Sequence, residues 1–232
     1  MTGSLAGFVR SRLAAILLIG AGIAAVLTLS QKPFANSAFE FGHISDYQGV
    51  VSIDPYPVLE VNGERLLLMG PGKTDATVEV EARSGDGARL RGTAIHRGLL
   101  RAVEVVRGSV AAARLEPRSG AGISSHGRHT LRGEIVDSKC YLGVMKPGRY
   151  KPHRACAVNC IRGGAPPVLV VEDRNDRIGF FLLVDEEGRA VNQRVLDLVA
   201  EPVEITGEVV RRDNLLYLEA DPQTYRRLEP GS

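Results

Sequence analysis

The sequence predicts an all-β protein with short helices, in which one membrane-spanning helix precedes two small β barrels. Three observations lead to this fold class. An apolar, charge-free run lies near the N-terminus. Short segments rich in Val, Leu and Ile follow it, separated by turn signals. The last five of these segments are interrupted once by a helical pattern.

The apolar run extends from Leu13 to Leu29 without a charge or a proline, close to the shortest span, about 17 residues, that crosses a bilayer core. Arg10 and Arg12 precede it and only Lys32 follows closely, so the positive-inside rule predicts a cytoplasmic N-terminus. The sequence therefore predicts a single-pass protein of the bacterial inner membrane, with residues 1–12 cytoplasmic, 13–30 as anchor and the rest periplasmic.

A cleaved secretory signal is the alternative, because Ala35-Asn36-Ser37 resembles a small-residue cleavage site. Both alternatives export the remainder of the chain. An exported chain meets an oxidising compartment, where free thiols are uncommon.

Residues 31–38 are predicted as a linker and residues 39–115 as a first small β domain, a barrel or a meander. Asp-Pro, Asn-Gly, Gly-Pro-Gly and Asp-Gly signals separate its strands. The strands are predicted at residues 47–53, 56–61, 65–70, 76–83, 88–96 and 99–106.

The Gly- and Ser-rich residues 116–130 are predicted as a linker between the domains. Residues 131–229 form the second domain, with an apolar stripe at 190–199 that indicates a short helix between the third and fourth strands. Five strands with a helix in that place are the order of an OB-fold barrel. The strands are predicted at residues 131–137, 166–173, 178–188, 202–210 and 214–221.

Composition and motifs exclude several classes of function. A net charge of +2 and few aromatic residues on the strands argue against a nucleic-acid partner. The stretch Gly70–Thr74 reads GPGKT, but a phosphate loop needs a glycine where Leu67 stands, so a hairpin turn is favoured. The chain lacks a Gly-x-Ser-x-Gly elbow, and we expect a non-catalytic protein.

All three cysteines lie between Ser138 and Gly164. Pro152 suits a first helical turn and the following Gly-Gly and Pro-Pro pairs end it, so His153–Ile161 is predicted as a helix. On that helix His153, Cys156 and Cys160 share one face. Cys140 directly follows the first strand of the domain, so a fourth group can meet that face.

Four interpretations of this convergence remain open. Cys140 could form a disulfide with Cys156 or Cys160, worth about 3 kcal/mol in the chain-entropy model. Cys140, His153, Cys156 and Cys160 could together ligate zinc or copper. A thiol with a lowered pKa could carry out thiol-disulfide exchange, and haem attachment is disfavoured because C-x-x-C-H is absent.

Basic residues surround the cysteines, and no Asp or Glu stands between Asp137 and Glu172. The stretch therefore predicts a surface for an anion or an acidic partner beside the sulfurs. Its members are Lys139, Lys146, Arg149, Lys151, Arg154 and Arg162.

Residues 131–221 resemble a group of exported bacterial OB-like domains. In these a strand ending in Asp-x-x-Cys is followed by a His, a Cys-Ala-x-x-Cys helix and a Gly-Pro turn. The segments FEFG at 39–42 and PYP at 55–57 resemble the same kind of two-domain protein. The resemblance implies no activity, but it implies that the cysteines and the histidine act as one unit. The matching residues are Asp137, Cys140, His153, Cys156, Ala157, Cys160, Gly164 and Pro166.

Taken together, the sequence predicts a membrane-anchored periplasmic accessory protein for a redox or assembly system, with a Cys/His site that binds a metal. Its expected partners are the membrane, through the N-terminal helix, and another exported protein. A thiol-disulfide redox protein and a structural partner-binding protein with one disulfide are the alternatives.

Overall fold

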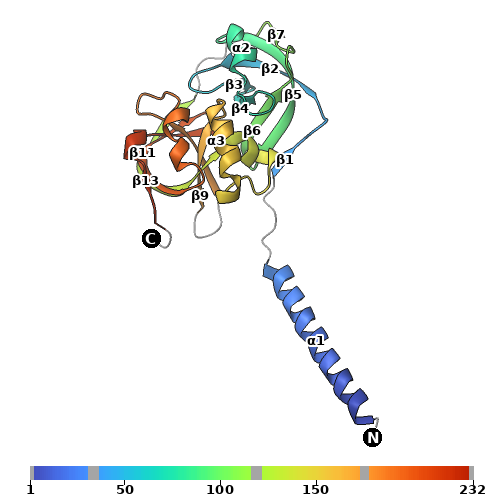
Figure 1. Ribbon diagram of the computed structural model, residues 1–232. Coiled ribbons are helices and arrows are strands. Elements are labelled where there is room, and N and C mark those ends of the chain that lie inside the picture. The colour runs from blue at the N-terminus through green and yellow to red at the C-terminus, as the bar shows by residue number, and fades with distance from the viewer. Residues whose placement is uncertain (1–2, 31–36, 116–121, 173–177, 230–232) are drawn as a thin grey trace. The chain divides into compact units, whose positions relative to one another are not determined.

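A computed structural model of the chain describes residues 3–30, 37–115, 122–172 and 178–229 (Figure 1). The chain divides into two compact units, Met1–Ala35 and Asn36–Ser232. The first unit contains helix α1 (Gly3–Ser30). Its segment Gly7–Leu29 has a mean hydropathy of 2.2. At about 1.5 Å per residue this segment is long enough and apolar enough to cross a membrane.

The second unit begins with a closed five-stranded barrel. Strand β2 pairs with β3, β3 with β4, β4 in parallel with β6, β6 with β5, and β5 again with β2. Two short strands, β1 (Ser37–Phe39) and β7 (Ala111–Ala112), add to β5. The barrel strands are β2 (Ser45–Ser52), β3 (Val58–Val61), β4 (Glu64–Met69), β5 (Gly87–Arg97) and β6 (Leu100–Val105).

A second closed barrel follows with the same pairing order. Strand β8 pairs with β9, β9 with β10, β10 in parallel with β12, β12 with β11, and β11 with β8. The barrel strands are β8 (Ile123–Asp137), β9 (Pro167–Glu172), β10 (Ile178–Val184), β11 (Pro202–Arg212) and β12 (Leu215–Glu219), and β13 (Arg226–Arg227) adds to β11.

The two barrels thus share one topology, and the predicted all-β class with an OB-like second barrel is confirmed. The first barrel has the same strand order, so it too is OB-like rather than a meander. In each barrel short helical turns join the third and fourth strands. These turns are α2 (Thr77–Val80) and η1 (Glu81–Arg83) in the first barrel, and η4 (Asn192–Arg194) and η5 (Leu196–Leu198) in the second.

Two predicted elements are wrong, and a third, the short helix at 190–199, takes the form of 3₁₀ turns. Residues 76–83 form helical turns instead of a strand, since Ala76 and Val80 are buried while Val78 is 90% exposed. Residues 190–199 form two 3₁₀ turns rather than a helix, although the stripe of Val191, Val195 and Val199 is fully buried. The described part of the predicted linker 116–130 belongs to β8, which pairs with β11 from Ile123 onward.

The barrels share a core and do not form separate domains. One cluster of buried side chains joins Leu67, Met69 and Ile95 of the first barrel to Val168 and Leu182 of the second. Burial of apolar side chains supplies most of the folding free energy. The two barrels therefore form one unit that begins at about residue 36, as the division of the chain indicates.

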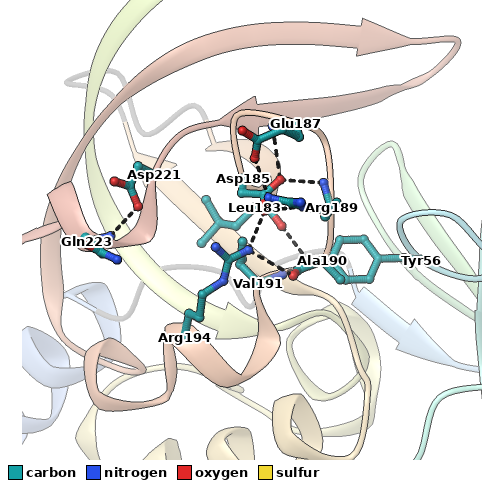
Figure 2. A network of polar contacts seen from close by, with 10 residues as sticks. All are labelled: Tyr56, Leu183, Asp185, Glu187, Arg189, Ala190, Val191, Arg194, Asp221 and Gln223. Atoms are coloured by element: carbon teal, nitrogen blue, oxygen red, sulfur yellow. Dashed lines mark hydrogen bonds and ion pairs between the residues drawn. The ribbon is translucent and has the colours of Figure 1, made fainter.

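Tyr56 connects the barrels through hydrogen bonds as well as packing (Figure 2). Its side chain is 2% exposed, its hydroxyl donates to Leu183 O at 2.6 Å, and it accepts from Val191 N at 3.3 Å. The same figure shows Asp185, which accepts hydrogen bonds from Arg189 and Arg194. Burial raises the pKa of Asp185, but these hydrogen bonds outweigh it and hold the pKa below its usual range.

We expect Tyr56→Phe to lower the free energy of unfolding by about 1–3 kcal/mol, because two buried backbone groups lose their partner. Denaturant titration of the full chain in detergent measures this change. Tyr150→Phe is the matched control, since Tyr150 is 49% exposed. Equal stability of the two variants would show that the Tyr56 hydroxyl does not hold the barrels together.

Candidate functional site

The end of strand β8 positions the first cysteine. Asp137, the last residue of the strand, is fully buried, and its Oδ1 accepts a hydrogen bond from Cys140 N at 2.7 Å. A carboxylate three residues before an amide commonly starts a helical turn in this way. The turn is η2 (Cys140–Val144), a single π-helical turn. The Asp-x-x-Cys pattern thus fixes where the Cys140 thiol lies.

The connection between β8 and β9 contains Cys140 and also a helix that supplies the other two cysteines. Helix α3 (Arg154–Arg162) follows the 3₁₀ turn η3 (Lys151–His153), in agreement with the predicted helix to within one residue at each end. Gly164 ends it with a φ of +107°, a conformation suited to glycine. Asn192 fixes this end further, because its Nδ2 donates to Ile161 O at 2.8 Å and to Ala165 O at 2.9 Å.

The three thiols converge on Cys140. Its Sγ lies 3.8 Å from both Cys156 Sγ and Cys160 Sγ. All three sulfurs lie within 4.8 Å of one another. Cys140 and Cys160 are buried, and Cys156 is half-buried. All three are free thiols, so the predicted disulfide is not formed in the structure, although its candidate partners are in contact.

His153 lies beside this group but is not part of it. Its Nε2 is 3.1 Å from Asp137 Oδ2, and both side chains are buried. The ligand atoms of Asp137, Cys140 and His153 lie within 4.8 Å of one another, whereas His153 does not group with all three sulfurs. The structure therefore brings the three predicted cysteines together and links His153 to them only through Cys140 and Asp137.

Sequence reasoning missed a further member of the site, Lys73. It lies in the Gly70–Thr74 stretch of the first barrel, which the sequence predicts as a simple turn. Its Nζ donates to Cys156 Sγ at 2.8 Å and lies 3.7 Å from Cys160 Sγ. Asp75 N also donates to Gly163 O at 3.0 Å, so the loop packs on the end of α3.

The thiols differ in their electrostatic environment. The hydrogen bond that Cys140 donates to Cys160 raises the pKa of Cys140, and burial adds to this effect. The same hydrogen bond lowers the pKa of Cys160, with help from Lys73 and against burial. The hydrogen bond with Cys156 raises the pKa of Lys73, which keeps the ammonium group charged. The site therefore pairs a cation with the sulfurs of α3.

The predicted anion surface is mostly neutralised by carboxylates from distant strands. Arg149 contacts Glu134 and Glu172, each at 3.4 Å, and stacks on the Tyr150 ring. Lys151 and Arg154 both pair with Glu201. Lys139 is buried against the first barrel and does not belong to a surface. Lys146 and Arg162 remain exposed.

Comparisons with known proteins identify no family. No family model matches the chain, and no curated protein matches it. One solved structure that matches is the crystal structure of a deletion mutant of the single-stranded DNA binding protein from Thermus aquaticus. It is 12% identical, covers 86% of this chain and 93% of that chain, and has a TM-score of 0.24.

This match corrects one expectation. The sequence argued against a nucleic-acid partner, but the matching structure is that of a DNA-binding protein, so the exclusion does not stand. The likeness is too low to carry an argument that this chain binds DNA.

Proposed function

We propose that this chain is a membrane-anchored, exported accessory protein that binds one metal ion through the thiols of Cys140, Cys156 and Cys160. In this proposal α1 holds the barrels at the periplasmic face of a bacterial inner membrane, where they serve a redox or assembly system. The chain performs no chemistry of its own and presents the ion to a protein partner.

The spacing of the sulfurs is the observation that carries the proposal. Thiolates bound to one ion with metal–sulfur bonds of about 2.3 Å are separated by about 3.8 Å in tetrahedral and about 4.0 Å in trigonal coordination. Cys140 Sγ lies at 3.8 Å from each of the other two sulfurs. An ion can therefore bind with little movement of the backbone. The buried Asp137, which holds both Cys140 N and His153, is the kind of supporting carboxylate that orients metal ligands.

We expect the full chain, purified in detergent without a chelator, to contain one zinc or copper ion per chain, and Cys140→Ser to contain less than about a tenth of that amount. Elemental analysis with protein quantification measures the ratio. Lys146→Ser is the control, since Lys146 is an exposed residue of the same connection. Metal-free protein that also fails to take up added zinc or copper would contradict the proposal.

Thiol-disulfide exchange is the second candidate, and one observation favours it. Cys156 is the half-buried one of the three thiols, so a partner's disulfide can reach it, and the Lys73 ammonium lies 2.8 Å from its sulfur. Cys156 would attack a partner's disulfide, which releases one partner thiol and forms a mixed disulfide. Cys140 would then attack the Cys156 sulfur, which releases the second partner thiol, so the partner leaves as a dithiol and a Cys140–Cys156 bridge remains. Thiol counts on metal-free protein distinguish the candidates: three free thiols favour the metal site, and one favours exchange.

A further inference from the structure

The ligand set of the thiol site is incomplete for a four-coordinate ion. Among the described residues, the three sulfurs form a group that contains no fourth ligand atom from His, Cys, Asp or Glu. His153 is the nearest candidate by sequence, but its Nε2 is engaged by Asp137 at 3.1 Å. Neither ring nitrogen of His153 groups with all three sulfurs, so a structural zinc site with four protein ligands would require the imidazole to move. The observed arrangement instead offers three sulfurs and no nitrogen.

The charge around the sulfurs requires a nearby cation, whether a divalent or a monovalent ion binds. Three thiolates leave one uncompensated negative charge around a divalent ion and two around a monovalent ion. Burying such charge is costly unless a cation lies close by. The first barrel supplies that cation, because Lys73 Nζ contacts the sulfurs of Cys156 and Cys160. The ammonium group thus lies beside the two sulfurs of α3. Its positive charge is opposite in sign to the excess charge on the thiolates.

Lys73 is held there by backbone contacts on both sides of it. Gly70 N donates to Thr74 O at 3.1 Å within the loop, and Asp75 N donates to Gly163 O at 3.0 Å. The ammonium also lies 3.4 Å from the carbonyl oxygen of Cys156. The position of this cation is therefore determined by how the Gly70–Thr74 loop of the first barrel packs on the segment that carries the cysteines.

We propose that the site is a three-coordinate, all-sulfur site for Cu(I), and that Lys73 from the first barrel offsets part of its excess negative charge. This inference rests on the proposed metal-binding function and specifies its ion. Soft thiolates bind both Cu(I) and zinc, but Cu(I) does not need a fourth ligand, whereas a structural zinc site almost always has four protein ligands. His153 then has a positioning role, in which it orients Asp137 and through it Cys140.

The test uses the full chain in detergent, under anaerobic reducing conditions. Cu(I) affinity is measured by competition with a colorimetric Cu(I) chelator, and Zn(II) affinity by competition with a colorimetric Zn(II) chelator. X-ray absorption of the copper-loaded wild type counts sulfur and nitrogen neighbours without any substitution. The variants are Lys73→Met, which keeps the stem and removes the charge, and His153→Gln, which retains a donor for Asp137. Lys146→Met is the matched lysine control.

We expect Cu(I) to bind one per chain, at least about a hundredfold more tightly than Zn(II), with only sulfur neighbours. Lys73→Met should weaken Cu(I) binding about tenfold or more, because a hydrogen bond to a charged group is lost. His153→Gln and Lys146→Met should change it less than about threefold.

Results of two kinds would overturn the inference while leaving the proposed function intact. One is an imidazole neighbour of copper, or a tenfold loss of affinity in His153→Gln. The other is Cu(I) binding in Lys73→Met that equals that of the wild type. Failure of the wild type to bind either ion is a separate outcome, which refutes the proposed function and the inference together.

Discussion

Gly163→Ala is expected to disrupt the contact between the barrels, with a loss of about 3 kcal/mol or more in the free energy of unfolding. A Cβ at this position would lie 1.8 Å from the backbone oxygen of Lys73. Backbone cannot yield as a flexible side chain does, and overpacking a tight contact costs about 1–3 kcal/mol or more. The hydrogen bond from Asp75 N to Gly163 O would be lost in the same movement.

The same substitution is expected to impair the thiol site, because Lys73 would be displaced from Cys156. Denaturant titration of the full chain measures the stability, and the rate of labelling by a thiol reagent measures the accessibility of Cys156. Gly122→Ala is the control, since its Cβ would make only an ordinary contact of 3.7 Å with Asp213 Oδ1. Wild-type stability and labelling in Gly163→Ala would show that the loop does not pack on α3 as described.

Gly163 also illustrates how much of the site could be predicted from the sequence. The Gly-Gly pair correctly predicts the end of α3, because glycine there is a local signal. The sequence does not reveal that the first of the two glycines also makes room for Lys73, about ninety residues earlier in the chain. Lys73 itself stands in a stretch whose only recognisable pattern is that of a turn. Contacts between distant segments leave no periodic signal.

The fold shows the same division between local and distant information. The second barrel was predicted because its strands alternate with clear turn signals. Residues 76–83 misled because Val and Glu alternate there, as in a half-buried strand, while burial follows a helical spacing. Residues 123–130 misled because Ser, Gly and His resemble a linker, yet they pair with β11. In that case backbone hydrogen bonding to a neighbouring strand overrides local propensity.

Lys139→Ala is expected to cost about 3 kcal/mol, the lower end of the loss when one partner of a buried ion pair is removed, because the Glu104 side chain is 24% exposed. The side chain of Lys139 is 3% exposed and forms an ion pair with Glu104 of the first barrel. Its Nζ also donates to Gly70 O at 2.7 Å and to Gly72 O at 2.8 Å. Alanine would leave a carboxylate and two carbonyl groups without their donor. Denaturant titration of the full chain measures the loss.

Lys146→Ala is the matched control and should change stability by less than about 0.5 kcal/mol, because Lys146 is exposed in the same connection. The pair of variants decides between two roles for the basic residues around the cysteines. A surface for an acidic partner requires lysines that reach solvent, and their removal should weaken partner binding while leaving stability unchanged. Lys139 is buried and binds the Gly70–Thr74 loop. Its removal should therefore lower stability, because it frees the same loop that carries Lys73. If Lys139→Ala proves as stable as Lys146→Ala, the coupling of the thiol site to the first barrel is wrong.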